Sequence, residues 1–204
     1  DMVLPGMAFG HVLRSPHAHA RIVSIDIAVA AAMPGVLAVL TGADWANSGY
    51  GDLPTGAGQK RRDGSPLYVP PYPALVADRV RRVGDYVAFV IAETKDQAKD
   101  AAELIDVEYE TLAHIASTAD AAQPGAALVW DDCPDNICFV HLGGDKEATD
   151  AAFEKADHVI RKTFFINRVT AATLEPRGSI GYYDVTEDHY TIYTTLQQAH
   201  PYRG

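Results

Sequence analysis

Hydrophobic and polar positions along the first forty residues predict a series of short strands. Residues 9–13 have strand length and strand-forming side chains, and residues 21–27 alternate between apolar and polar positions. Residues 28–33 predict one helical turn, which ends at Pro34-Gly35 because proline cannot continue a helix. Residues 36–40 form a continuous apolar run, which indicates a buried strand.

A second strand–helix–strand unit follows between residues 74 and 110. Residues 74–80, 86–92 and 105–109 predict strands, and Thr94 with Gln97 three positions later has the spacing of a capping box at a helix start. The helix has one face of small apolar residues at spacings of three and four: Ala98, Ala101, Ala102 and Ile105. Two such strand–helix–strand units predict an α+β domain in which helices pack on a mixed sheet.

The later part of the chain predicts a linker and the beginning of a second α+β domain. Proline and glycine interrupt residues 112–136, and Asp145 can then cap a helix. The inner side of that helix would carry Ala148, Ala151, Ala152 and Ala156. Residues 158–169 predict a long strand, and residues 179–185 and 189–195 predict a hairpin. We expect domains at residues 1–115 and 137–204, with a linker at 116–136.

A long loop separates the two strand–helix–strand units of the first domain. Residues 47–73 are rich in glycine, proline, aspartate and serine, and Lys60-Arg61-Arg62 lies in their middle. An anion site is one interpretation of this basic triplet, but a solvated loop tip is the favoured one.

Composition and charge exclude several classes of protein. The 204 residues are 48% hydrophobic and carry a net charge of −10, so the basic surface of a nucleic-acid-binding protein is missing. No apolar run approaches the ~20 residues of a membrane span, and no secretory leader is visible. The residues before Met7 look like the tail of a segment that starts earlier. We expect a cytoplasmic protein without a membrane span or nucleic-acid partner.

The metal-binding residue types are too sparse to predict a metal site. Cys133 and Cys138 cannot supply the four thiolates of an iron–sulfur cluster, and two reduced thiols are favoured over a disulfide or a metal site. His17 and His19 share one face of an expected strand edge, where hydrogen-bonded structural roles are favoured over metal binding.

Several motifs, in a shared order, carry a family resemblance. The matching segments are residues 7–35 with Arg14-Ser15-Pro16, residues 83–92, residues 97–110, Asn136 with Gly144-Asp145, and Glu175-Pro176-Arg177-Gly178. Together they resemble the molybdenum-binding subunit of the xanthine dehydrogenase, aldehyde oxidase and carbon monoxide dehydrogenase family. Leu174 stands where the family usually has methionine.

The resemblance implies an α/β hammerhead domain followed by the first part of a molybdopterin-binding domain. It implies a molybdenum-dependent oxidoreductase that hydroxylates an aldehyde or a heterocycle, or oxidises carbon monoxide. The expected cofactor of the full-length parent is molybdopterin. The expected partners are the rest of the molybdenum subunit and subunits or domains that carry iron–sulfur clusters and FAD.

The same resemblance leaves the catalytic residues outside this chain, which we expect to be inactive alone and to hold no metal. Glu175 and Arg177 are candidates for the substrate entrance, because Pro176 fixes the backbone between them and a guanidinium can hold an anion or a carbonyl bidentately. A structural ion pair between the two, which would fix the start of a strand, is the favoured interpretation. Gln197 and Gln198 are candidates for cofactor contact. The alternative function is a non-catalytic hammerhead module for assembly or interaction.

Overall fold

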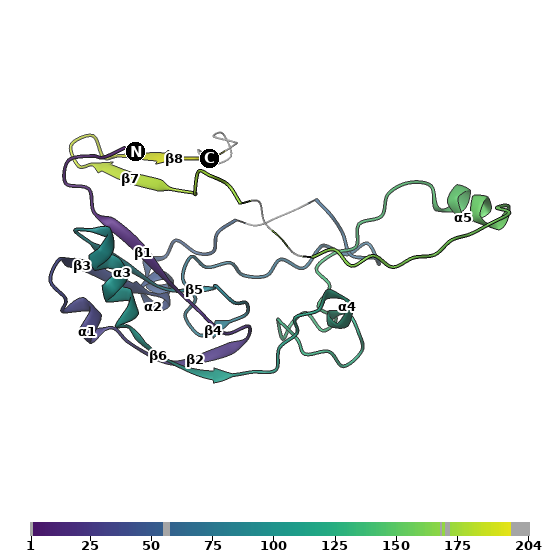
Figure 1. The fold of residues 1–204 in the computed structure, drawn as a ribbon, viewed down its shortest axis with the longest axis horizontal. Coiled ribbons are helices and arrows are strands. Elements are labelled where there is room, and N and C mark those ends of the chain that lie inside the picture. The colour runs from purple at the N-terminus through teal and green to yellow at the C-terminus, as the bar shows by residue number, and fades with distance from the viewer. Residues whose placement is uncertain (1, 55–57, 168, 170–171, 197–204) are drawn as a thin grey trace. The chain divides into compact units, whose positions relative to one another are not determined.

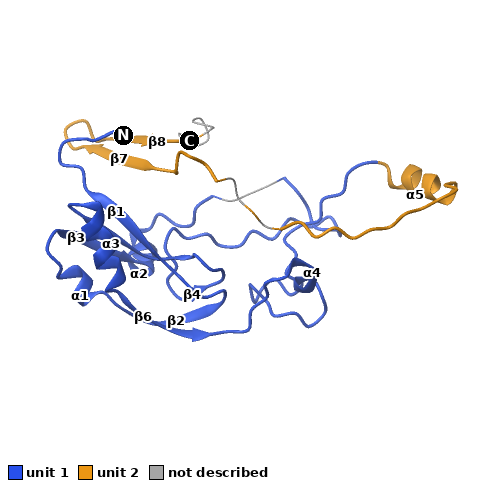
Figure 2. Ribbon diagram, in the orientation of Figure 1, with its two compact units in different colours: residues 1–144 blue, residues 145–204 orange. Residues whose placement is uncertain are grey.

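The computed structural model describes residues 2–54, 58–167, 169 and 172–196, in two compact units (Figure 1). The first unit spans residues 1–144 and the second spans residues 145–204 (Figure 2). The elements of the first unit are β1 (Phe9–Arg14), β2 (Ala20–Asp26), α1 (Ala28–Ala31), β3 (Val36–Thr41), α2 (Gly42–Ser48), β4 (Arg79–Val80), β5 (Tyr86–Ala92), α3 (Lys95–Glu103), β6 (Asp106–Thr111) and α4 (Thr118–Ala121).

Two three-stranded sheets make up the first unit, with the strand orders β1-β5-β3 and β4-β2-β6. Phe9 and Val36 both pair with Ala92, so β5 is the central strand of the first sheet. The α+β class is confirmed. The mixed sheet is a correction, because every strand pair among the described residues is antiparallel. The long connection from β3 to β5 lets the chain return antiparallel, whereas a parallel neighbour in a mixed sheet would need a crossover connection.

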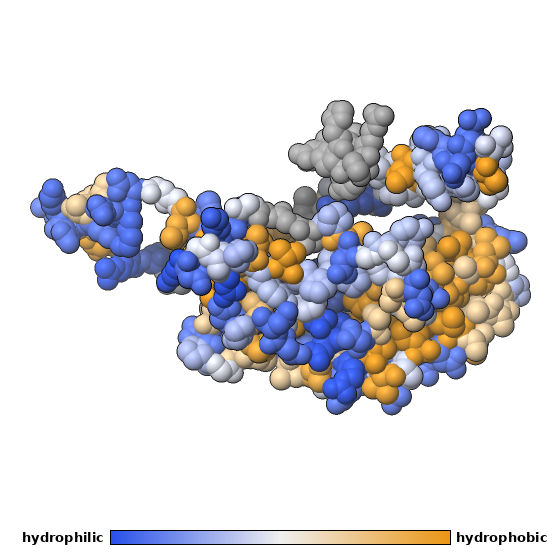
Figure 3. Space-filling view, turned by 180° about the vertical axis from the view of Figure 1, so that it is seen from behind, coloured by the Kyte–Doolittle hydropathy of each residue, from blue (hydrophilic) through white to orange (hydrophobic). Residues whose placement is uncertain are grey.

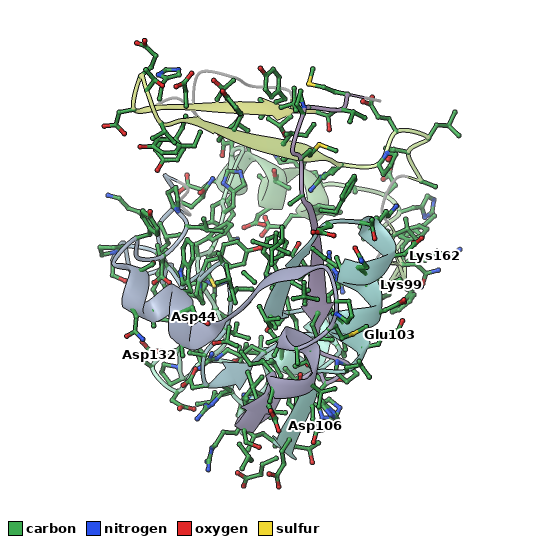
Figure 4. All side chains as sticks on the ribbon, turned by 90° about the vertical axis from the view of Figure 1, so that its left-hand side faces the viewer. Asp44, Lys99, Glu103, Asp106, Asp132 and Lys162 are labelled. Carbon is green, nitrogen blue, oxygen red and sulfur yellow. The ribbon has the colours of Figure 1, made fainter. Side chains whose placement is uncertain are left out.

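Helices α1 and α3 pack on the first sheet through small side chains. The Oγ of Thr94 accepts a hydrogen bond from the N–H of Gln97, which starts α3 as the capping spacing predicts. The core beneath contains Ala30, Ala88, Val90, Ala92, Ala98, Ala101, Ala102 and Ile105. The outer face of α3 is charged, and the Nζ of Lys99 lies 4.0 Å from the Oε1 of Glu103 there (Figure 4). Alanine at the buried positions lets the helix lie close to the sheet.

A second cluster of buried residues joins the two sheets. Ala20, Val80 and Val87 are fully buried, and Ile25 and Val107 contact both this cluster and the core under α3. The two sheets therefore share one continuous apolar interior. Some apolar residues also reach the outside of the unit (Figure 3), and Leu37 for example is 58% exposed.

Helix α2 lies in a region where we expected no helix. Both the N–H and the Oγ of Thr41 donate to the carboxylate of Asp44, at 2.7 Å and 2.8 Å, and this closes a capping box (Figure 4). Gly42 is buried against the backbone of Val76, and a Cβ on it would lie 2.2 Å from the Val76 oxygen. The Thr41-Gly42 pair therefore ends β3 and starts a helix.

The second unit contains one helix and one hairpin among its described residues. Helix α5 (Lys146–Glu154) begins at Asp145, whose carboxylate accepts from the N–H of Ala148. Strands β7 (Ser179–Asp184) and β8 (His189–Thr194) form the predicted hairpin. The helix start and the hairpin are confirmed.

Two expectations for this unit are wrong in the described residues. Residues 158–167 form no strand, and Ile160 and Phe165 are each 92% exposed, because strand-forming side chains do not make a strand without a partner. The alanine side of α5 is not covered, since none of the helix residues is buried. Local propensity sets the helix, but burial requires a second surface.

Candidate functional site

Glu175 and Arg177 lie in an irregular segment that leads into β7. Both residues are exposed, as is Leu174 before them, and no ion pair joins Glu175 to Arg177 among the described residues. The structural ion pair that we favoured is therefore absent between these two residues. The guanidinium of Arg177 is open to an anionic or carbonyl group.

The hairpin that follows is fixed by polar contacts at its open end. The Oγ1 of Thr194 donates to the carbonyl oxygen of Gly178 at 3.2 Å and lies 3.0 Å from the Oγ of Ser179. These contacts hold the residue after Arg177 against the opposite strand.

The tyrosine pair at the turn of the hairpin is stacked. The rings of Tyr183 and Tyr190 lie 4.5 Å apart, and the hydroxyl of Tyr183 donates to the carboxylate of Asp188 at 2.8 Å. This hydrogen bond raises the pKa of Tyr183, because the phenol donates to a carboxylate. Asp188 has a φ of 48°, in the left-handed region that tight turns require.

The described residues of the second unit do not form a cofactor pocket by themselves. Gln197 and Gln198 lie outside the described residues. One open groove of about 490 Å³ runs along α5, and its lining residues are Asp145, Ala148, Thr149, Ala152, Phe153 and Ala156. This surface offers one carboxylate and otherwise small or apolar groups. Neither Glu175 nor Arg177 lines it.

The two histidines have structural roles in the first unit. His19 is buried, and its Nδ1 donates to the carbonyl oxygen of Ala113 at 2.7 Å. His17 packs edge-on against Tyr109, with ring centroids 4.7 Å apart. No group of three potential ligand side chains able to hold a metal ion occurs within the part of the chain that the structure describes.

A cluster of arginines and aspartates, which the sequence analysis did not identify, holds residues 117–141 against the rest of the first unit. We call this segment the strap. Arg61 forms an ion pair with Asp135, and Arg79 forms one with Asp131 at 3.0 Å. Most of the expected linker at residues 116–136 lies within the strap, and its later part, from Val129 onward, is attached to the rest of the unit.

Aromatic groups reinforce the same attachment. The guanidinium of Arg81 lies 3.7 Å from the centroid of the Trp130 ring, a cation–π contact. The hydroxyl of Tyr68 donates to the carboxylate of Asp132 at 2.5 Å, and Figure 4 labels this aspartate. Burial, followed by the hydrogen bond to this carboxylate, raises the pKa of Tyr68.

The position of Arg61 corrects the interpretation of the basic triplet. Its side chain is only 24% exposed, and it also donates to the carbonyl oxygen of Ile137 at 2.5 Å. Arg61 is therefore a structural residue beneath the strap and not part of a solvated loop tip. The hydrogen bond from the N–H of Ile137, together with the charge of Arg61, lowers the pKa of Asp135. The complementary charges are visible in the sequence, but their spacing follows no helical or strand period.

Residues 1–113 match the family model described as aldehyde oxidase and xanthine dehydrogenase, a/b hammerhead domain. Residues 129–204 match the model described as molybdopterin cofactor-binding domain. The two models follow each other along the chain, and the second begins inside the strap.

Similar proteins include large subunits of bacterial dehydrogenases. The carbon monoxide dehydrogenase large chain of Afipia carboxidovorans is 37% identical over 100% of this chain and 25% of its own length. The nicotinate dehydrogenase large molybdopterin subunit of Eubacterium barkeri is 36% identical over 100% of this chain and 44% of its own length. The chain therefore spans between a quarter and less than half of these relatives.

Solved structures have the same fold over nearly the whole chain. The reconstituted CO dehydrogenase from Oligotropha carboxidovorans superposes with a TM-score of 0.83 at 36% identity, covering 99% of this chain and 25% of that chain. The aldehyde oxidoreductase from Desulfovibrio gigas superposes with a TM-score of 0.74 at 26% identity, covering 94% of this chain and 20% of that chain. Both similarities extend over the hammerhead match and most of the cofactor-domain match.

Proposed function

This chain belongs to the aldehyde oxidase and xanthine dehydrogenase family, and we propose that it is part of the large subunit of a molybdenum hydroxylase. One observation carries the proposal: a hammerhead model and a molybdopterin cofactor-binding model match consecutive parts of the same chain. The parent protein would oxidise an aldehyde, a heterocycle or carbon monoxide. A bound molybdenum cofactor would supply the redox chemistry.

We propose domain boundaries at residues 1–115 and 137–204, with residues 116–136 as the connection. The hammerhead match over residues 1–113 and the two buried clusters of the first unit support the first boundary. The contacts of the strap support a connection that is fixed to the hammerhead domain and does not swing freely.

Within this assignment the chain alone would bind no molybdopterin and catalyse no reaction. The exposure of Glu175 and Arg177 and the absence of any enclosure around them, within the described residues, support this view. Electrons would leave through iron–sulfur and FAD centres on partner subunits or domains, since two cysteines are too few for a cluster.

The free thiols of Cys133 and Cys138 support a cytoplasmic location. Among the described residues, no helix has the length and apolar character needed to cross a lipid bilayer.

The test is to purify the natural full-length protein with its partner subunits. Metal analysis should find close to stoichiometric molybdenum, and aldehydes, N-heterocycles or carbon monoxide should reduce an artificial electron acceptor. The 204-residue chain is the control and should contain no molybdenum. A full-length protein that is folded but lacks both molybdenum and turnover would support the non-catalytic module instead.

We further propose that Arg177 and Glu175 lie at the substrate entrance of the parent enzyme, and that Gln197 and Gln198 contact its cofactor. The exposed guanidinium, which is not paired with Glu175, supports a role for Arg177 in binding. Arg177→Lys keeps the charge but loses the planar fork. The loss of one charged hydrogen bond would lower kcat/KM by roughly 10- to 100-fold.

Molybdenum content and Tm should stay unchanged in this variant. Arg161→Lys, at an exposed position of the same unit, is the matched control and should retain full activity. A lower Tm of Arg177→Lys, with normal turnover per folded molecule, would show that Arg177 is a structural residue.

A further inference from the structure

The two cysteines of the chain flank one tight turn of the strap. The carbonyl oxygen of Cys133 accepts from the N–H of Asn136 at 3.0 Å, and the φ of 55° at Asn136 turns the chain back. The Sγ of Cys133 then lies 3.7 Å from the carbonyl oxygen of Ile137. That carbonyl belongs to the peptide bond of Cys138, so the sulfur of Cys133 lies next to the backbone of the second cysteine.

The two thiols differ in exposure and in surroundings. Cys133 is 2% exposed, whereas Cys138 is half-buried. The guanidinium of Arg61 donates to the same Ile137 oxygen that the Cys133 sulfur contacts, and it also pairs with Asp135. A fixed positive charge therefore lies beside the buried sulfur, where it stabilises a thiolate during a reaction. Burial, together with the nearby carboxylate of Asp135, acts in the opposite direction and raises the pKa of the resting Cys133 thiol.

We propose that Cys133 and Cys138 form a reversible dithiol–disulfide modification site, oxidised by a small-molecule disulfide such as oxidised glutathione. Cys138 is the thiol that the reagent reaches, and Cys133 is the one that resolves the mixed disulfide. The assignment is independent of the proposed enzymatic activity.

The reaction has two exchange steps. The Cys138 thiolate attacks the sulfur–sulfur bond of the reagent, which forms a mixed disulfide and releases one reduced thiolate. The Cys133 thiolate then attacks the Sγ of Cys138, which forms the internal disulfide and releases the second reduced thiolate. The two protons lost by the cysteines go to the two leaving thiolates. The protein loses two electrons and the reagent gains them.

Disulfide formation changes the contacts of the strap. The Sγ of Cys133 must move away from Asp135 and the Ile137 oxygen and toward Cys138. Arg61 binds both Asp135 and the Ile137 oxygen, so its contacts are affected as well. Trp130 lies in the same strap, on the guanidinium of Arg81. Its fluorescence therefore reports whether the attachment of the strap changes with the redox state.

The experiment equilibrates the native protein in buffers of reduced and oxidised glutathione, then blocks free thiols by alkylation and measures the intact mass. Formation of the internal disulfide should make the protein about 2 Da lighter, protect both cysteines from alkylation and reverse with reduced glutathione. The Trp130 emission should change over the same range of redox ratios.

Two variants, checked for folding by circular dichroism, define the order of the steps. Cys133→Ala should stop at a glutathione adduct on Cys138, whereas Cys138→Ser should stay unmodified because Cys133 is buried. A native protein that accumulates only glutathione adducts, or that forms the disulfide only after denaturant is added, would overturn the proposal.

Discussion

Replacement of Asn136 by alanine should loosen the internal structure of the strap, because this one side chain makes three hydrogen bonds within it. Its Nδ2 donates to the carbonyl oxygens of Ala121 at 2.9 Å and Ala127 at 3.0 Å, and its Oδ1 accepts from the N–H of Val129 at 2.9 Å. Its backbone lies in the left-handed region, with a φ of 55°. Asparagine tolerates that conformation better than residues with a plain Cβ.

The expected magnitude follows from these two terms. Three hydrogen bonds at about 1 kcal/mol each give about 3 kcal/mol, and partial access of water at this half-buried position reduces the sum to about 2 kcal/mol. The left-handed backbone conformation at this position costs alanine about 1 kcal/mol of unfolding free energy, and it adds no such cost for glycine. Asn136→Ala should therefore lose about 3 kcal/mol of unfolding free energy and Asn136→Gly about 2 kcal/mol.

Urea unfolding followed by tryptophan fluorescence and circular dichroism measures both values. Asn47→Ala is the matched control, at an exposed position of α2, and should change the free energy by less than about 0.5 kcal/mol. The Trp130 transition should move to lower urea in both Asn136 variants. If both variants unfold within about 0.5 kcal/mol of the native protein, Asn136 does not hold the strap, and the reasoning is refuted.

Three further predictions concern the first unit and its contrast with the second. Gly42→Ala should lower stability by about 1–3 kcal/mol in thermal unfolding, because its Cβ would meet the Val76 oxygen, whereas Gly58→Ala has open space and should have little effect. The hydrogen bonds from Thr41 lower the pKa of Asp44. The ionised Asp44 carboxylate therefore stabilises the fold fully above the ordinary carboxyl pKa, and this stabilisation is lost as the pH falls through the lowered pKa. Asp44→Asn should therefore be less stable than the native protein at pH 7, with a difference below about 1 kcal/mol that disappears once the pH has fallen through the lowered pKa, and a constant difference would contradict this. Amide exchange should be slower in β5 than in β7 and β8, because β5 is a central strand while the hairpin stands in a two-stranded sheet, and equal protection would show that the hairpin is covered.

The sequence predicts the elements whose signal is local. Thr94 and Asp145 each start a helix as their capping spacing indicates, and the hairpin follows from alternating residues around a polar turn. The strap is different, because Arg61 and Asp135 are far apart in the sequence and their pairing follows no period. Residues 158–169 show the opposite failure: their composition favours a strand, but a strand requires a partner that local sequence does not specify.

The candidate site follows the same division. Glu175 and Arg177 could be chosen from their spacing around Pro176, because proline restricts the backbone locally. Whether the two side chains pair depends on their surroundings, and in the structure they do not. The pairing of Arg61 and Arg79 with the strap could not be chosen in advance, since many charged residues of this acidic chain offered equally plausible partners.

The strand order of the first unit has a consequence for how the chain folds during synthesis. β1 and β3 both pair with β5, and β2 pairs with β4 and β6, so the early strands do not pair with one another. Phe9, for example, stays without its partner until Ala92 has left the ribosome. Contacts between residues so far apart in sequence make folding slow, because a long loop must close before any of them forms. Residues 86–111 therefore act as the late template on which the first forty residues assemble, and apolar segments such as β3 stay open to chaperones until then.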